Sequence, residues 1–328
     1  MKANTLNQKR FGSVLSEYGA FIALALLILG LSAISPDFRT PSNFLNLLRQ
    51  ATFNGLIAIG MTLVILSDGI DLSVGSVFAL SAIICAELIV IGVGAFLAVC
   101  IALVVGTALG TVSGLLVTKG RLQPFIATLI TMTAYRGLAK ILTDGKPISR
   151  LAASANSGSF FFKALGKGNL VSSFSENIKI PIPVVILVLA FVIFWFLLTK
   201  TTFGRRVYAT GSNAKCAALV GVNTAKVKIS VYAIAGFLAA MAGILMISRV
   251  DSAQPTLGDG MELDAIAAVA LGGTSMSGGR GRITGTVAGV LIIAVLNNGL
   301  NILNVTSYYQ EVIKALVILV AVLSDRKR

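Results

Sequence analysis

A small set of polar residues interrupts the long apolar stretches of this sequence. They are Asn54, Asp71, Asn297 and Asn298, together with Asp68 and Glu87. Such side chains are expensive to bury inside a bilayer, and the first four are the candidate pathway-lining positions. Amides and carboxylates can hydrogen-bond to the hydroxyl groups of a neutral ligand such as a sugar. The alternative is a hydrogen bond between helices, worth about 0.6–2 kcal/mol, and both interpretations stay open for Asn297 and Asn298. Glu311 and Lys314, three residues apart, are expected to form a local ion pair.

The sequence lacks the residue patterns of an enzyme. It has no histidine, the usual proton shuttle and metal ligand. It also has no Gly-x-x-x-x-Gly-Lys-Ser/Thr loop to hold the phosphates of ATP. The glycine-rich run Gly272–Gly281 lacks the lysine of such a loop, so a tight turn is the favoured interpretation. None of the three cysteines has a partner at metal-binding spacing. No catalytic residue, metal or cofactor is therefore expected in this chain.

The composition is that of a membrane protein. Hydrophobic residues make up 56% of the chain and charged residues 12%, against about 45–50% and 25% in a soluble domain. A net charge of +14 would suggest nucleic-acid binding in a soluble chain. Here the basic residues gather in short loops, where they set the orientation of membrane helices. We therefore expect contact with membrane lipid and no binding of nucleic acid.

Ten apolar segments separated by turn signals predict an all-α, polytopic membrane protein with about ten transmembrane helices. The segments are 18–35, 43–66, 72–91, 94–118, 124–143, 182–199, 229–248, 262–274, 283–303 and 308–324. The eighth has only about 13 residues, too few to cross roughly 30 Å of hydrocarbon. The stretch Ser67–Ser73 places two carboxylates between apolar runs. Non-helical backbone at membrane depth must be buried in protein or line a wet cavity, so both regions are expected beside a pathway.

The basic residues predict that both termini are cytoplasmic. Six of them lie between residues 199 and 228, and a loop this rich in Lys and Arg stays on the cytoplasmic side. The first apolar segment has no small-x-small cleavage pattern, so we expect it to remain as the first helix. The predicted domains are a cytoplasmic N-terminus at 1–17, a transmembrane domain at 18–324 with a cytoplasmic loop at 200–228, and a cytoplasmic C-terminus at 325–328.

The sequence also contains an apparent internal repeat. The run Gly106–Gly114, Gly-x-x-x-Gly-Thr-Val-Ser-Gly, parallels Gly281–Gly289, Gly-x-x-x-Gly-Thr-Val-Ala-Gly. The runs belong to the fourth and ninth segments, so an odd number of crossings separates them and their orientations are opposite. This predicts the inverted repeat found in many transporters. The alternative is that glycines every four residues are generic helix-packing faces.

Motifs along nearly the whole chain resemble the ribose-type sugar permeases of ABC importers. They are Gly60-Met-Thr-Leu-Val-Ile-Leu, Gly69-Ile-Asp-Leu-Ser-Val-Gly75, Lys119-Gly-Arg121, Ser252-Ala-Gln-Pro255, Glu262-Leu-Asp-Ala-Ile-Ala-Ala-Val and Leu271-Gly-Gly-Thr-Ser. Two further motifs, Asn297-Asn-Gly-Leu-Asn301 and Ser307-Tyr-Tyr-Gln310, favour ribose within that family. Relatives for arabinose, galactose or xylose share the first set. The resemblance implies the pore-forming permease subunit of an ATP-driven importer in a bacterial inner membrane, working by alternating access.

The resemblance also implies partners and site residues. The expected partners are a second copy of the chain, a periplasmic sugar-binding protein, and a cytoplasmic ATPase whose two nucleotide-binding domains use ATP and Mg. Ala217, Ala218 and Gly221 match the Ala-Ala-x-x-x-Gly element that such permeases present to the ATPase. Arg249 is a candidate docking cation for the binding protein, and interfacial snorkelling is its alternative. A secondary transporter would need a coupling-ion site instead, and a membrane enzyme would need a convergent catalytic set.

Overall fold

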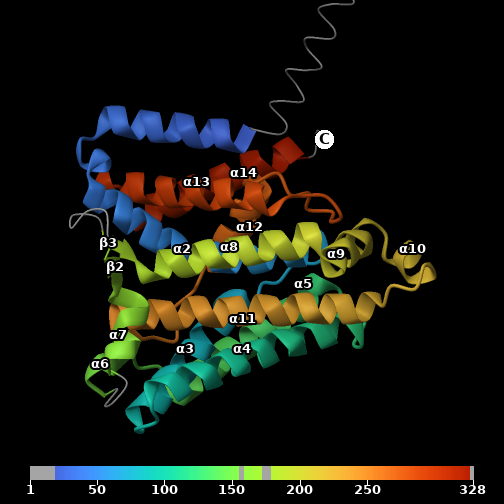
Figure 1. The fold of residues 1–328 in the computed structure, drawn as a ribbon, viewed down its shortest axis with the longest axis horizontal. Helices are drawn as coiled ribbons and strands as arrows, with labels where there is room; N and C mark the ends of the chain where they lie inside the picture. The colour runs from blue at the N-terminus through green and yellow to red at the C-terminus, as the bar shows by residue number, and fades with distance from the viewer. Residues whose placement is uncertain (1–18, 155–158, 172–178, 326–328) are drawn as a thin grey trace, which may run out of the picture.

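The computed structural model is built almost entirely from α-helices (Figure 1), and it describes residues 19–154, 159–171 and 179–325. The predicted N-terminal segment 1–17 and the last residues, 326–328, lie outside these ranges. The longer helices are Gly19–Ile34, α2 (Pro41–Leu66), α3 (Val74–Val90), α4 (Ala95–Thr118), α5 (Pro124–Thr143), α8 (Ile182–Lys200), α11 (Thr224–Val250), α12 (Met261–Leu271), α13 (Ile283–Ile302) and α14 (Ser307–Asp325). The shorter elements are η1 (Asp37–Arg39), α6 (Leu151–Ser154), α7 (Ser159–Lys167), α9 (Thr202–Ser212), α10 (Ala214–Leu219), β1 (Ile148–Ser149), β2 (Asn169–Val171), β3 (Lys179–Pro181) and β4 (Ser252–Ala253).

The apolar segments predicted from the sequence coincide with these longer helices. Among the described residues, six helices are long and apolar enough to cross a membrane: α2, α4, α5, α8, α11 and α13. This bears out an all-α, polytopic membrane fold. Helix α3 and the helix Gly19–Ile34 are shorter apolar helices, so the number of ten crossings stays a prediction.

The helical pattern is interrupted at two places, and the first is the stretch 67–73 that the sequence singled out. Residues 67–73 join α2 to α3 without helical structure, and residues 251–260 separate α11 from α12. Helix α12 itself has only 11 residues. In the second break, β4 pairs with β1 in antiparallel register, Ala253 opposite Ile148. The other small sheet pairs β2 with β3.

Local signals set the helix boundaries. Proline is within the first turn of α2, α5 and α8, where its missing N–H costs nothing. Helix α10 is capped by Asn213, whose side-chain oxygen accepts from the Cys216 N–H at 3.0 Å. Asn223 caps α11 in the same way, accepting from the Lys226 N–H at 2.9 Å. The first cap sets where α10 begins within the basic loop, and the second sets where α11 begins.

Small residues let the central helices pack closely. Helix α11 packs against α2, α3 and α4. A Cβ built at Gly110 of α4 would collide with the carbonyl oxygen of Tyr232 and lie 3.0 Å from the Cα of Gly236, both on α11. A Cβ at Gly289 of α13 would collide with the carbonyl oxygen of Ala268 on α12. The glycine runs noted in the sequence are therefore helix-packing faces, as in other membrane helix pairs.

The two halves of the chain show similar packing relations. In the first half, α3 packs against α4 and α5, and α4 also packs against α11. In the second half, α12 packs against α13 and α14, and α13 also packs against α2. Helices α2 and α11 pack against each other between these groups.

The connecting elements gather at the two ends of the long helices (Figure 1). Helices α9 and α10 project beyond one end, while α6, α7, β2 and β3 lie at the opposite end. The end with α9 and α10 carries the basic loop at 200–228.

Candidate functional site

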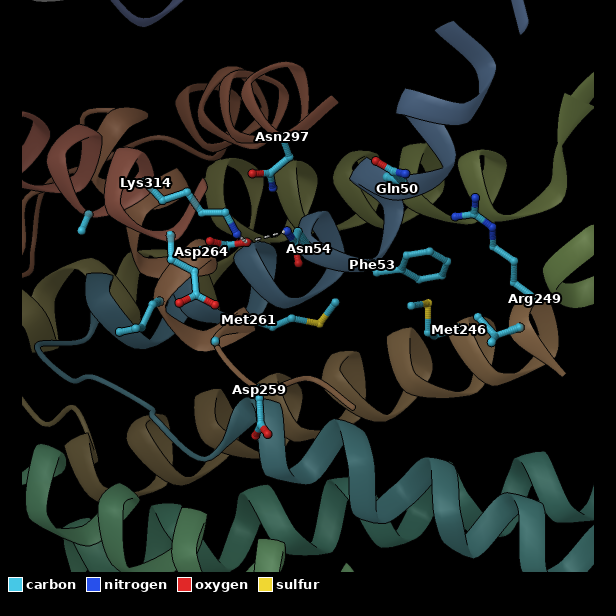
Figure 2. Close-up of a pocket in the computed structure, with 15 residues that line it drawn as sticks. Gln50, Phe53, Asn54, Met246, Arg249, Asp259, Met261, Asp264, Asn297 and Lys314 are labelled. Atoms are coloured by element: carbon cyan, nitrogen blue, oxygen red, sulfur yellow. Dashed lines mark hydrogen bonds and ion pairs between the residues drawn. The ribbon is translucent and has the colours of Figure 1, made fainter. Parts of the chain in front are cut away.

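A cavity of about 780 Å³ opens between helices from both halves of the chain (Figure 2). Its walls come from α2, α11, α12, α13 and α14. The lining residues are Gln50, Phe53, Asn54, Met246, Arg249, Val250, Asp259, Gly260, Met261, Leu263, Asp264, Asn297, Glu311, Lys314 and Ala315. Its volume lies within the range of about 300–1,000 Å³ typical of small-molecule sites. The short helix α12 thus borders a cavity, as its length predicted.

A polar network crosses one wall of the cavity (Figure 2). Oδ2 of Asp264 lies 3.3 Å from Nζ of Lys314 and accepts a long hydrogen bond of 3.4 Å from Nδ2 of Asn54. Lys314 therefore pairs with α12 rather than with Glu311, and the predicted local ion pair is wrong. The ammonium turns inward because Asp264 offers a carboxylate that is more buried than the exposed Glu311.

Two asparagine side chains that line the cavity each have a buried amide oxygen that accepts no hydrogen bond from the described residues. Oδ1 of Asn54 and Oδ1 of Asn297 are buried and have no hydrogen-bond partner within residues 19–154, 159–171 and 179–325. Nearly all buried polar atoms in proteins are paired, so each such atom calls for a specific explanation. The structure brings these two predicted residues into one cavity from α2 and α13.

Asn298 and Asp71 lie outside this cavity. Asn298 exchanges two hydrogen bonds with Asn43, at 3.0 and 2.8 Å between their amide atoms. This is the interhelical alternative considered from the sequence, so Asn298 joins α13 to the start of α2. Asp71 lies in the turn between α2 and α3, where its Oδ1 accepts from the N–H of Ser73 at 2.9 Å and from its hydroxyl at 2.6 Å.

The surroundings of Asp71 form a separate, closed polar cluster. The Ser73 hydroxyl lies 3.3 Å from that of Ser113, which in turn donates to the Thr131 hydroxyl at 3.1 Å. Burial of Asp71 raises its pKa to about 6, although the two bonds from Ser73 act in the opposite direction. The cluster joins the start of α3 to the C-terminal part of α4 and the first half of α5, and Oδ1 of Asp71 accepts both bonds from Ser73.

Arg249 lies at the end of α11 and lines the cavity. Its guanidinium stands 5.8 Å from the ring centre of Phe53, a cation–π distance. Arg49 is near enough to interact with it electrostatically and donates to Oδ1 of Asn169 at 2.8 Å. Arg249 is half-buried, so its charge faces the cavity margin rather than projecting freely from the surface.

Arg136 is a structural contributor that sequence reasoning missed. From α5 it donates through Nη1 to the carbonyl oxygens of Pro255 and Leu257, at 2.6 and 2.7 Å. Its Nη2 lies 2.5 Å from Oδ1 of Asp259. These bonds fix the segment that leads into α12, and thereby one wall of the cavity. The available signal was a single arginine inside the apolar segment 124–143, which is costly unless paired.

The predicted coupling element forms the tip of the basic loop. In α10, Ala217 is buried, whereas Leu219 and Val220 are 88% and 80% exposed. Gly221 has φ +85°, with no atom within 4 Å of a Cβ built there. Its N–H donates to the carbonyl oxygen of Ala218 at 3.0 Å, which ends α10 in a tight turn. This left-handed conformation favours glycine at 221, and Leu219 and Val220 remain exposed in the part of the chain that the structure describes.

Helix α9 and its neighbours join this tip to the turn between α12 and α13 and to the connection between α2 and α3. The Tyr208 hydroxyl donates to the carbonyl oxygen of Gly281 at 2.9 Å. The Gly279 N–H donates to the carbonyl oxygen of Leu66 at 3.1 Å, and Nζ of Lys228 donates to that of Asp68 at 3.1 Å. The glycine-rich run at 272–281 is thus a turn that joins α12 to α13, as the sequence favoured. Within the part of the chain that the structure describes, no group of three or more His, Cys, Asp or Glu residues is placed to hold a metal.

Comparison with known proteins identifies the family. The family model for the permease component of the branched-chain amino acid transport system matches residues 43–322. The ribose import permease of Bacillus subtilis (strain 168) is 52% identical over 323 residues, covering 98% of this chain and 97% of that protein. Those of Haemophilus influenzae (strain Rd) and Escherichia coli (strain K12) are 47% and 46% identical and cover 99% and 100% of this chain, and 98% and 100% of their own lengths. No solved structure shows significant similarity. The chain is therefore similar to ribose import permeases along nearly its whole length. It belongs to the family of membrane transport permeases described as the permease component of the branched-chain amino acid transport system.

Proposed function

We propose that this chain is the transmembrane permease subunit of an ATP-driven ribose importer. The observation that carries the proposal is the similarity to ribose import permeases over essentially the whole chain, at 46–52% identity. The cavity between the two halves supplies a compartment for a small polar solute. The chain itself is not an enzyme, and ATP and Mg are used by the partner ATPase.

The coupling surface is the tip formed by Ala217, Ala218 and Gly221. Two features support it. Leu219 and Val220 present an exposed apolar surface beside them, and the left-handed Gly221 ends the helix at that point. Through Tyr208, α9 links this tip to the turn before α13. Motion of the two nucleotide-binding domains would therefore reach the α12–α13 side of the cavity through α9.

The membrane arrangement follows from the loop charges and helix contacts. The end with α9 and α10 faces the cytoplasm of a bacterial cell, both termini lie on that side, and the chain crosses the inner membrane about ten times. The recurring packing of α3, α4 and α5 and of α12, α13 and α14 supports an inverted repeat. Alternating access then consists of one half rocking against the other around the cavity.

The assembled importer contains two copies of this chain, the ATPase and a periplasmic sugar-binding protein. Arg249 lies at the cavity margin with Arg49 nearby, so the two guanidinium groups offer positive charge to carboxylates of the binding protein. Arg249 serves as the residue on which the periplasmic binding protein docks. Its packing over Phe53 means that docking and the shape of the cavity are coupled.

A sugar panel tests the proposal. The purified chain with its ATPase and the sugar-binding protein should hydrolyse ATP faster when ribose is present, and the chain alone should hydrolyse none. Arabinose, galactose and xylose should stimulate less than ribose. A stronger response to one of them would assign the importer to that monosaccharide, and robust hydrolysis by the chain alone would refute the permease assignment.

A further inference from the structure

We propose that the cavity is a sugar-binding site of the permease itself, in which Asn54 and Asn297 accept hydrogen bonds from pentose hydroxyls. This inference rests on the proposed ribose importer and names where the sugar is held inside the membrane part. An importer of this kind does not require such a site, because the binding protein alone could supply selectivity.

The two unpaired amide oxygens carry the inference. Each belongs to a side chain that lines the cavity, and each lacks a donor among the residues that the structure describes. An unmet buried acceptor destabilises the protein that contains it. The terminal torsion of Asn is soft, so a modest rotation turns either oxygen toward a ligand. A sugar hydroxyl is the donor that such an oxygen needs.

The charges around the cavity favour a neutral ligand. The lining carboxylates of Asp259 and Asp264 are paired with Arg136 and Lys314. The remaining lining carboxylate, Glu311, is opposite in charge to the remaining lining cation, Arg249. The lining holds two cationic and three anionic side chains, and Arg136, which pairs with Asp259 from outside the lining, brings the local charge to zero. The ammonium, amides and carboxylates of the lining provide both donors and acceptors.

Apolar side chains complete a site suited to a sugar. Phe53, Met246 and Met261 line the same cavity (Figure 2). Sugar rings have C–H faces that pack against such side chains, while their edges carry the hydroxyls. The cavity thus places apolar surface beside hydrogen-bonding groups, a combination that small-molecule sites also have.

The other polar cluster shows what a purely structural arrangement looks like in this chain. Oδ1 of Asp71 accepts two hydrogen bonds from Ser73, and the Ser113 hydroxyl donates to that of Thr131. Both clusters lie among corresponding helices of the proposed repeat, but only the cavity combines unpaired acceptors with open volume. The contrast favours a ligand in the cavity over a packing role for Asn54 and Asn297.

Equilibrium binding of radiolabelled ribose to the purified permease–ATPase complex in nanodiscs, without the binding protein, tests the site. We expect saturable binding by the unsubstituted complex. Asn54→Leu and Asn297→Leu should each weaken it roughly tenfold, because each removes a hydrogen bond to the sugar. Asn297→Asp should retain most of the affinity because a carboxylate still accepts. Asn46→Leu, at an exposed position two turns before Asn54 on α2, is the matched control and should bind normally.

Deoxyribose analogues make the test independent of variant folding. In the unsubstituted complex, loss of the hydroxyl that donates to Asn297 should weaken binding roughly tenfold, and the same loss should have little effect in Asn297→Leu. A merely structural role would show no such coupling. Absence of saturable binding, or leucine variants that bind as tightly as the control, would overturn the site. Uptake of ribose by the full importer is measured in parallel. Absence of ribose uptake would refute the proposed function, whereas the binding measurements test only the proposed sugar site.

Discussion

Arg136 should be a major determinant of the shape and stability of the cavity. Its guanidinium is 15% exposed and makes three contacts with the segment before α12, two of them to backbone carbonyls. Replacement by glutamine leaves those carbonyls without their charged donor. Each such bond contributes about 1.5–3 kcal/mol, whereas the contact with Asp259, which is 62% exposed, adds only about 1 kcal/mol or less. We expect Arg136→Gln to lower the free energy of unfolding by about 3–5 kcal/mol.

Unfolding of the purified protein in mild detergent, followed by circular dichroism against denaturant, measures this effect. Arg136→Lys keeps the charge but cannot reach three acceptors in one fork, so its loss should be intermediate. Lys140→Gln, at an exposed position one turn later on α5, is the matched control and should stay within about 0.5 kcal/mol. Ribose binding should weaken in Arg136→Gln, because the start of α12 is released. An Arg136→Gln variant as stable as the Lys140→Gln control would refute the proposed role of this contact.

Three further outcomes follow from individual positions. Gly110→Ala should destabilise the protein by about 1–3 kcal/mol because the added Cβ meets the backbone of α11. Gly137 has open space around it, so Gly137→Ala should be neutral or stabilising by up to about 1 kcal/mol. Thermal unfolding of the two variants should show changes in stability of opposite sign, or none for Gly137→Ala. The raised pKa of Asp71 means that its ionisation opposes folding, so stability should fall by roughly 3 kcal/mol as pH rises from about 4 to above 6. Asp71→Asn should remove that dependence in unfolding measured across this range, and an unchanged pH profile would exclude it. Gly221→Trp should leave the protein in the membrane but uncouple uptake from ATP hydrolysis. The backbone φ of +85° is unfavourable for tryptophan, and its bulky side chain would lie on the coupling surface. Normal uptake by this variant would show that this tip does not contact the ATPase.

The sequence predicted the helices well because hydrophobic length is a strong signal in membrane proteins. The short α12, the break at 67–73 and the turn conformation of Gly221 were also predictable, since each depends on local residues. Among the candidate site residues, Asn54 and Asn297 meet in one cavity, whereas Asn298 pairs with Asn43. Sequence periodicity cannot distinguish Asn297 from its neighbour Asn298, because the facing helix decides which of the two amides finds a hydrogen-bond partner.

The long-range polar contacts could not be predicted from the sequence. Lys314 pairs with Asp264 instead of its neighbour Glu311, because the fold brings a carboxylate 50 residues away within reach. The carbonyl groups held by Arg136 lie more than 100 residues further along the chain. Contacts of this kind depend on how separate helices pack, and a single sequence carries no direct signal for that.

The central claim is that this chain moves sugar only when a partner ATPase drives it. The most direct measurement is the uptake of radiolabelled ribose into proteoliposomes that contain the chain with or without the ATPase, with the binding protein on one side and ATP on the other. Our account predicts uptake that requires both ATP and the ATPase and that is not driven by an imposed proton or sodium gradient. Ribose accumulation by the chain alone, driven by an ion gradient, would contradict it.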